Sequence, residues 1–273
     1  MFMTTSSRFK NWIASWRDWE WNPVVLKELR QAARNRMLLN ILLIALALLF
    51  LVFLFFLLRN DLLPIGNQPL GRPVFSALLS IQAAISILFV PAYIGVRLAL
   101  ERRESDLDLM FVTALTPAQI IRGKLLCGAY LVAMFMSVAA PFMEFTTLLR
   151  GVDLPTVILI LLSLYAVGCL AVQAAILFAC LPVRTFVKVI SGLVLAALLL
   201  AAFGGVMRMF LNLLGTGSGV ANLNFWIGFA MFLLLILAAI RILFSMSANL
   251  ILSDQLPRGY FNEVIRPVAL EVA

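Results

Sequence analysis

Long apolar stretches separated by short polar segments dominate the pattern of hydrophobic and polar positions along this chain. An apolar run of about 20 residues is long enough, as a helix, to cross about 30 Å of hydrocarbon. Such runs cover residues 38–58, 74–100, 125–149, 154–181, 187–207 and 224–244, with a helical continuation of the last to residue 252. The pattern therefore predicts an all-α membrane protein with six transmembrane helices.

The composition supports this class and argues against several others. Of the 273 residues, 63% are hydrophobic and only 12% are charged, which is more apolar surface than a soluble domain can bury. Histidine is absent, so the commonest metal ligand and the commonest general base are missing. The three cysteines have neither zinc-ligand spacing nor the arrangement of a disulfide framework. We therefore expect no catalytic, metal-binding or cofactor-binding residue in this chain, and we do not expect an enzyme.

The basic residues are distributed unevenly between the two sides of the predicted spans. The net charge is +8, and 17 of the 21 Lys and Arg residues lie in or beside the two terminal segments and the segments after the second and fourth spans. Basic residues accumulate on the cytoplasmic side of membrane proteins. Both termini of this multi-pass protein are therefore expected to be cytoplasmic. This topology explains the net charge without nucleic-acid binding.

The predicted spans divide the chain into three parts. These are a cytoplasmic N-terminal segment at 1–37, a transmembrane domain at 38–252 and a cytoplasmic C-terminal tail at 253–273. The predicted external loops are short, so no external domain is expected to capture a ligand. No obvious internal repeat relates the two halves, which argues against an inverted-repeat transporter.

The last part of the N-terminal segment has the pattern of a helix that lies in the membrane interface. Asn followed by Pro is a helix start signal, with Asn at the N-cap and Pro at the first helical position. An apolar stripe and a basic face follow, and tryptophans precede them at helical spacing. The residues of this candidate helix are Asn22, Pro23, Lys27, Glu28, Arg30 and Arg34. The alternative is an ordinary basic flank with tryptophans at the interface.

The segment between spans two and three is patterned and not merely polar. An acidic cluster opens a short helix over about residues 105–115, in which apolar side chains recur at helical spacing. A Thr-Pro pair then forms a second helix start that leads into the third span. The candidate contact residues are Glu101, Arg102, Arg103, Glu104, Asp106, Leu107, Asp108, Phe111, Leu115, Thr116 and Pro117. We expect a cytoplasmic docking helix that fills a groove on a partner; the alternative is a solvated loop.

Two stretches resemble the permease subunits of ABC-2 type transporters. The sequence LALERRESDLDLMFVTALTPAQIIRGKLL (98–126) is similar to the segment after the second span in that family, with its acid and arginine cluster, Leu-rich helix, Thr-Pro turn and Gly-Lys pair. The sequence NPVVLKELRQAARNR (22–36) is similar to the amphipathic connecting helix before the first span. The chain departs from the family pattern at Ser105-Asp106, where Gly-Thr is usual.

The resemblance implies a permease subunit that pairs with a second permease subunit, identical or different, and with separate ABC ATPase subunits, usually for export. It makes the 105–115 segment a coupling helix that contacts the ATPase. It also implies a bacterial cytoplasmic (inner) membrane. Because the chain has no G-x-x-x-x-G-K-[ST] loop, ATP and Mg are expected on the partner ATPase.

Two charged residues and one run of small residues complete the candidates. Glu144 is the one acid well inside a predicted span, and intramembrane acids are functional candidates by default. Glu144 and Arg208 are therefore candidates for a gate or substrate path. The alternative is a carboxyl near the interface that is hydrogen-bonded, or paired with Arg208 or Arg150. The run AAFGG at 201–205 offers a close-packing face for another helix or a second copy.

Three functions remain open from the sequence. The first is the ABC-2 type permease. The second is an ion-coupled secondary carrier or channel, which would use several intramembrane carboxylates or histidines as relays. The third is a membrane scaffold that docks a cytoplasmic partner through the same insert and does not transport. The substrate cannot be predicted from the sequence.

Overall fold

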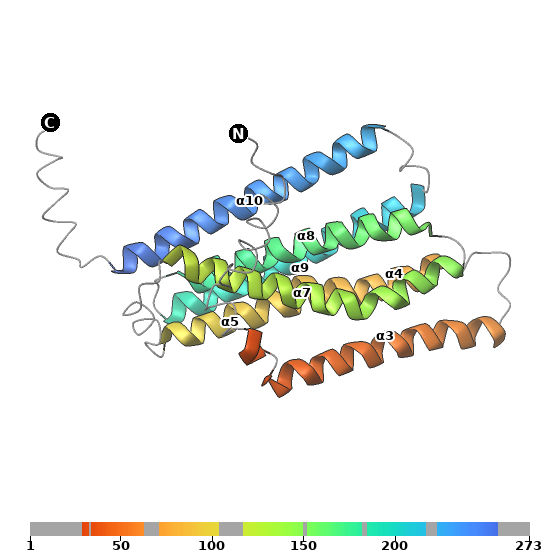
Figure 1. Cartoon of the computed structure of the whole chain (residues 1–273), viewed down its shortest axis with the longest axis horizontal. Helices are drawn as coiled ribbons and strands as arrows, with labels where there is room; N and C mark the ends of the chain where they lie inside the picture. The colour runs from red at the N-terminus through yellow and green to blue at the C-terminus, as the bar shows by residue number, and fades with distance from the viewer. Residues whose placement is uncertain are drawn as a thin grey trace, which may run out of the picture.

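The structure is a computed structural model that describes residues 29–32, 34–62, 71–103, 117–149, 152–181, 185–216 and 223–255. All regular structure in these ranges is helical. The elements are α3 (Arg36–Leu62), α4 (Gly71–Ala84), the π-helical turn η1 (Ile85–Phe89), α5 (Val90–Arg103), α7 (Pro117–Leu148), α8 (Leu154–Ala179), α9 (Thr185–Thr216) and α10 (Leu223–Gln255). They lie roughly alongside one another as an elongated bundle, and successive spans run in opposite directions (Figure 1).

The described part of the chain contains six helices that are long and apolar enough to cross a membrane, with α4, η1 and α5 counted as one. This number confirms the prediction from the apolar runs. Most of the helices extend beyond the predicted limits of the spans, whereas α8 ends at Ala179, two residues before the predicted limit. Helix α7 begins at Pro117 and α9 continues to Thr216, because helical hydrogen bonding continues through the polar residues that flank each apolar core.

The second span contains a π-helical turn that the hydrophobic pattern did not predict. The N–H of Val90 donates to the carbonyl of Ile85, five residues earlier, while both neighbouring caps keep right-handed helical dihedrals. Pro91 follows directly and has no N–H, and its ring crowds the carbonyl four residues before it. A wider turn at this point accommodates the proline without ending the helix. The span therefore continues as one unit from Gly71 to Arg103.

Helix α8 is the centre of the bundle and packs against α5, α7, α9 and α10 (Figure 1). Small residues allow its closest approaches. A Cβ added to Gly128 of α7 would lie 2.4 Å from Cγ1 of Val172, and one added to Gly95 of α5 would lie 3.3 Å from Cβ of Ala175. Close backbone approach through small residues is the usual way in which membrane helices gain packing energy. Helices α5, α7 and α8 thus form a tightly packed three-helix core.

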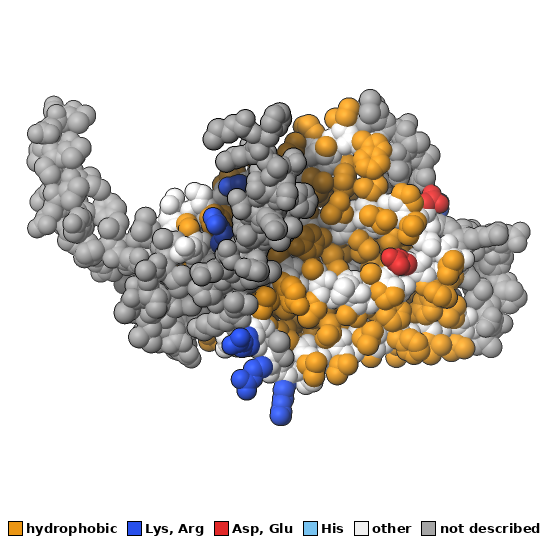
Figure 2. Space-filling view, in the orientation of Figure 1, with side chains coloured by type: hydrophobic (Ala, Val, Ile, Leu, Met, Phe, Trp, Pro, Cys, Tyr) orange, Lys and Arg blue, Asp and Glu red, His pale blue; other side chains and the backbone are white. Residues whose placement is uncertain are grey.

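Helices α3, α9 and α10 leave most of their surface uncovered. Leu193 of α9 and Leu235 of α10 are 66% and 68% exposed, and Ile44 of α3 is 63% exposed. Figure 2 shows hydrophobic side chains over much of the described surface. In water such a surface would drive aggregation, whereas in a bilayer it faces lipid chains. Only a few side chains, such as Leu49 and Phe210, anchor these outer helices to the core.

On the face shown in Figure 2, the described Lys and Arg side chains lie in the left part of the view and the described Asp and Glu side chains lie in the right part. We call the end where α3 and α7 begin and α5 ends the basic end, because Arg34, Arg97 and Arg122 lie in the segments there. The opposite end carries Glu144 and Asp153. On the sequence prediction, the basic end is the cytoplasmic one.

Candidate functional site

The predicted docking helix falls outside the described residues. This applies to residues 104–116, and therefore to Glu104, Asp106, Leu107, Asp108, Phe111, Leu115 and Thr116. The described helices border this segment on both sides. Glu101, Arg102 and Arg103 form the last turn of α5, and Pro117 is the first residue of α7, where the Thr-Pro pattern predicts a helix start.

The predicted interfacial helix is described only at its end. Asn22, Pro23, Lys27 and Glu28 lie outside the described residues, whereas the residues at 29–32 and 34 are helical. Arg30 and Arg34 lie one helical turn apart and are both exposed. The helix is interrupted at Asn35, and α3 begins at the next residue.

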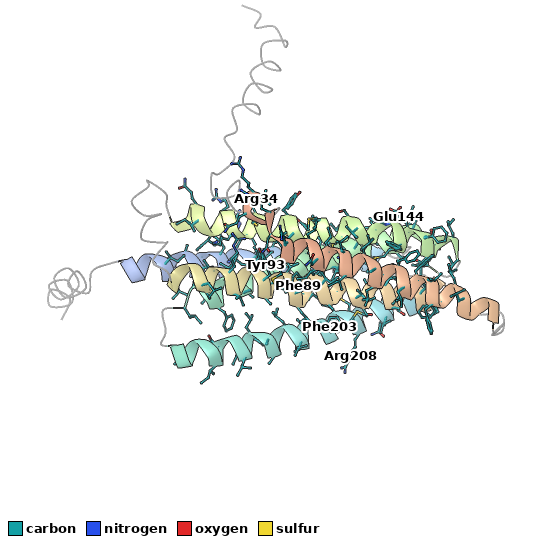
Figure 3. All side chains as sticks on the ribbon, turned by 90° about the horizontal axis from the view of Figure 1, so that it is seen from below. Arg34, Phe89, Tyr93, Glu144, Phe203 and Arg208 are labelled. Carbon is teal, nitrogen blue, oxygen red and sulfur yellow. The ribbon has the colours of Figure 1, made fainter. Side chains whose placement is uncertain are left out.

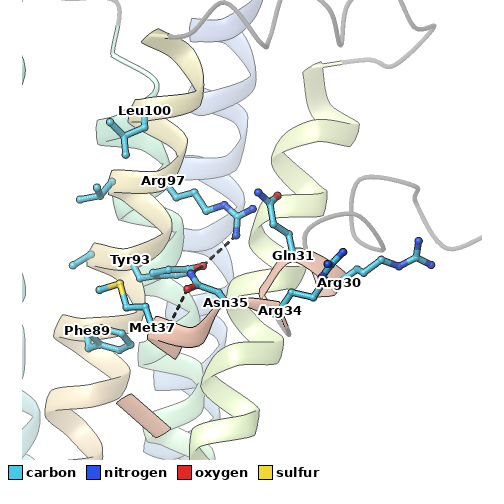
Figure 4. A pocket seen from close by; sticks show the side chains of 11 residues that line it. Arg30, Gln31, Arg34, Asn35, Met37, Phe89, Tyr93, Arg97 and Leu100 are labelled. Atoms are coloured by element: carbon cyan, nitrogen blue, oxygen red, sulfur yellow. Dashed lines mark hydrogen bonds between the residues drawn. The ribbon is translucent and has the colours of Figure 1, made fainter. Parts of the chain in front are cut away.

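Asn35 caps α3 and connects it to the second span. Its Oδ1 accepts a hydrogen bond from the N–H of Met37 at 2.9 Å, which satisfies one of the free N–H groups in the first turn. This bond fixes the orientation of the amide, so that Nδ2 donates to the hydroxyl of Tyr93 at 3.2 Å. Nη1 of Arg97, one turn further along α5, donates to the same hydroxyl at 3.1 Å. Tyr93 therefore joins the start of α3 to α5 (Figure 4).

A cleft of about 1260 Å³ surrounds this junction at the basic end. Its walls come from the residues before α3, from the start of α3 and from one face of η1 and α5 (Figure 4). The described residues that line it are Arg30, Gln31, Arg34, Asn35, Met37, Phe89, Ala92, Tyr93, Val96, Arg97 and Leu100, of which none is acidic. Phe89 stacks on Tyr93 with ring centroids 6.3 Å apart and meets Phe135 of α7 edge to face. The site therefore combines three cations, a phenol hydroxyl and an apolar wall.

Sequence reasoning identified only part of this cleft. It assigned Arg30 and Arg34 to a basic interfacial face, and it counted Arg97 only as a topology signal. Asn35 and Tyr93 were missed, because their contact joins residues 58 positions apart. The one local signal was Asn35 itself, since an Asn directly before a long apolar run is a typical N-cap.

Glu144 and Arg208, the candidates for a gate, are not brought together within one chain. Both side chains are exposed, and Figure 3 shows them on opposite sides of the bundle. Glu144 lies four residues before the end of α7, and its backbone carbonyl accepts a hydrogen bond from the hydroxyl of Thr147 at 2.7 Å. Within one chain, the structure thus provides no Glu144–Arg208 ion pair among the residues it describes.

In the run at 201–205, Phe203 packs against the hydrophobic core, but the two glycines make no close contact with another described helix. A Cβ added to Gly204 or Gly205 would meet nothing within 4 Å. The glycines that do mediate close contacts are Gly95, Gly128 and Gly168, in the core around α8. Gly204 and Gly205 therefore do not provide a close contact within one chain. Their contact with a second copy of the chain stays a prediction.

Buried amides are a further feature that the sequence analysis missed. Gln82 is completely buried, and its Nε2 donates to the hydroxyl of Ser86 at 3.3 Å. Gln173 of α8 is also completely buried and donates to the hydroxyl of Ser247 of α10 at 3.1 Å. The Oε1 atoms of both amides are buried without a hydrogen-bond partner in the part of the chain that the structure describes. The Gln173 bond joins α8 to α10, whereas the Gln82 bond lies within the second span.

Comparisons with family models, with curated proteins and with solved structures find no match to this chain. No group of three or more Cys, Asp or Glu residues suited to hold a metal occurs among the described residues. The findings therefore define a membrane-type bundle of six apolar helices, with a basic, partly apolar cleft at one end.

Proposed function

We propose that this chain is the permease subunit of an ABC-2 type exporter, that it forms the substrate path and that separate ATPase subunits drive it. One observation carries the proposal. The segment that resembles the coupling helix joins α5 and α7, and both of these helices approach α8 closely at a glycine. A push on residues 104–116 would therefore act on the best-packed part of the molecule.

The packing favours a rigid response of the three-helix core. At Gly128 the backbone of α7 lies so close to Val172 that a Cβ fits only if the neighbouring atoms move. Gly95 of α5 approaches Ala175 less closely, with an added Cβ 3.3 Å from the Cβ of Ala175. Packed interiors transmit displacement because they compress little. Helices α5, α7 and α8 would move together when the coupling segment is displaced. The outer helices α3 and α9 have far less buried surface and can slide more easily against this unit.

We place the second permease subunit against α9 in this proposal. Ala201 and Gly205 are exposed on α9, and a Cβ added to Gly205 would meet no described atom within 4 Å. Small residues of this kind suit close contact between membrane helices. The substrate path would then run between two copies. Glu144 would face this path or the lipid interface, depending on how the two copies are oriented.

The experiment replaces the central apolar residue of the coupling segment. We expect Phe111→Asp to abolish co-purification of the ATPase, because a carboxylate on the stripe cannot enter an apolar groove without a large desolvation cost. Phe261→Asp in the C-terminal tail is the matched control, with the same change on the same predicted side of the membrane. Both variants should insert into the membrane normally. Unchanged ATPase co-purification with Phe111→Asp would contradict the proposal and would favour a carrier or a scaffold.

A further inference from the structure

A second cleft lies between α5, α8 and α9, in the half of the bundle toward the basic end. Its volume is about 270 Å³, and its lining residues fall within 91–99 of α5, 175–179 of α8 and 191–199 of α9. It forms because α9 packs against α8, η1 and α4 but has little contact with α5. Figure 3 shows α9, which carries Phe203 and Arg208, along one edge of the bundle. We call this cleft the α5–α9 slot.

Small apolar side chains make the α5–α9 slot both open and nonpolar. Gly95 and Ala175 form its floor, where a Cβ added to the glycine would lie 3.3 Å from the Cβ of the alanine. On the facing helix, a Cβ added to Gly192 would meet nothing within 4 Å. Among the described lining residues, only Ser191 has a polar side chain. An ordered buried water needs about two to four polar partners, so the slot is unsuited to water and suited to hydrocarbon.

The dimensions of the slot match a single extended hydrocarbon chain. Pro91 and Ala99 are eight positions apart on α5, as are Ser191 and Leu199 on α9, and each interval covers about 12 Å along its helix. A volume of about 270 Å³ spread over about 12 Å has a cross-section of about 22 Å². A helix is about 10–12 Å across with its side chains and cannot enter so narrow a space, whereas a linear alkyl chain can.

The slot is continuous with the surface that faces the lipid chains. Its inner residues Ala175 and Leu199 are 1% and 7% exposed, whereas Val96 at its rim is 60% exposed. Leu193 of α9 is exposed as well. Residues 91–99 lie about 6–18 Å from the end of α5, which is roughly the depth of one leaflet of a hydrocarbon layer about 30 Å thick. A lipid chain can therefore enter sideways from the leaflet at the basic end.

We propose that the α5–α9 slot binds one acyl chain of a membrane lipid from the leaflet at the basic end. The chain would lie along Gly95 and Gly192, with its methyl end toward Pro91. Binding gains dispersion contacts for lining residues that would otherwise face a void. Because only the chain enters the slot, the headgroup stays at the membrane surface and its type should matter little. The chain would act as a spacer that holds α9 away from α5. This inference is independent of the proposed transport function.

The test uses a phosphatidylcholine that carries a diazirine halfway along one chain, in vesicles that contain the full-length protein. After illumination, mass spectrometry locates the cross-linked residues. Ala175 and Ala179 report on the slot, because both line it and are only 1% and 8% exposed, so that lipids outside the slot do not reach them. Leu162 of the same helix is 47% exposed and does not line the slot, so it reports on lipids outside it. We expect cross-links at all three positions.

Filling the slot should remove the cross-links inside it. The double variant Gly192→Leu/Ala196→Leu places two larger side chains, one helical turn apart, at positions that line the slot. It should lower cross-linking at the two slot positions roughly tenfold or more, because the leucines occupy the space of the chain. The matched control Gly228→Leu/Ala230→Leu makes the same replacements at exposed positions of α10 outside the slot, and should lower it less than about twofold. Cross-linking outside the slot should stay unchanged in both variants.

Three results would overturn the proposal. Cross-linking of the unaltered protein at Leu162 alone would show that no lipid chain enters the slot and that protein covers it. Equal cross-linking at the slot positions in both double variants would show that the chain reaches these positions by another route. The same labelled chain can also be supplied on phosphatidylglycerol. A difference of about threefold or more between the two lipids would assign the binding to the headgroup instead.

Discussion

The contact of Gly128 with Val172 provides the sharpest test of the packing around α8. Alanine at position 128 would place a Cβ 2.4 Å from Cγ1 of Val172, 3.2 Å from Cγ2 and 3.4 Å from Cβ. Carbon atoms normally lie about 3.5–4.0 Å apart, so α7 and α8 would have to separate by about 1 Å. A rotation of the valine side chain brings no relief, because both methyl groups are close and valine has one strongly preferred rotamer in a helix.

The expected cost follows from these distances. Overpacking a tight interior typically destabilises a protein by about 1–3 kcal/mol. The intrinsic preference of alanine for helix offsets this by up to about 1 kcal/mol, and the same offset applies to a control at Gly228, where an added Cβ meets nothing within 4 Å. We therefore expect Gly128→Ala to be about 1–3 kcal/mol less stable than Gly228→Ala.

The assay is equilibrium unfolding of the full chain in detergent micelles by added sodium dodecyl sulfate, followed by circular dichroism. A double-mutant cycle with Val172→Ala isolates the contact, because removal of the two methyl groups makes room for the new Cβ. The coupling energy should favour the double variant by about 1–3 kcal/mol. Equal stability of Gly128→Ala and Gly228→Ala, or a coupling energy near zero, would refute the close approach of α7 and α8.

Two further predictions concern the start of α3 and the open face of α9. Asn35→Ala removes the cap of α3 and a hydrogen bond to Tyr93; we expect a loss of about 1–2 kcal/mol in the same unfolding assay, and Asn35→Asp should restore the capping part. No change in Asn35→Ala would mean that the cap does not form. Gly205→Cys should form a disulfide-linked dimer under mild oxidation in membranes, whereas Gly228→Cys should not. Equal cross-linking at both positions would contradict a specific contact through α9.

The span count could be predicted because the bilayer sets a simple rule. A helix needs about 20 apolar residues to cross it, and each run of that length in the sequence became a helix in the structure. The Thr-Pro pair marked the start of α7 because proline is well suited to the first helical position. The π-helical turn before Pro91 could not be predicted in the same way, because a proline within an apolar run is compatible with a kink, a break or a wider turn.

The contacts between helices depend on information that the linear pattern does not hold. The run of small residues at 201–205 was predicted to offer a close-packing face, whereas the close contacts in the structure are made at Gly95, Gly128 and Gly168. All of these glycines lie in apolar surroundings, so only the arrangement of the helices distinguishes them. The hydrogen bond between Asn35 and Tyr93 also depends on how the helices are arranged, because Asn35 precedes the first span and Tyr93 lies in the second. The charge of the cleft was visible in the sequence, but its shape was not.

The central claim is that a separate ATPase acts on the segment between α5 and α7. The most direct measurement places a photo-reactive amino acid at Phe111, with a control at Asn67 in the loop predicted to be external, and identifies the cross-linked proteins by mass spectrometry. The account predicts that position 111 alone captures a soluble protein with Walker and signature motifs. Good expression without capture of any ATPase at position 111 would contradict it.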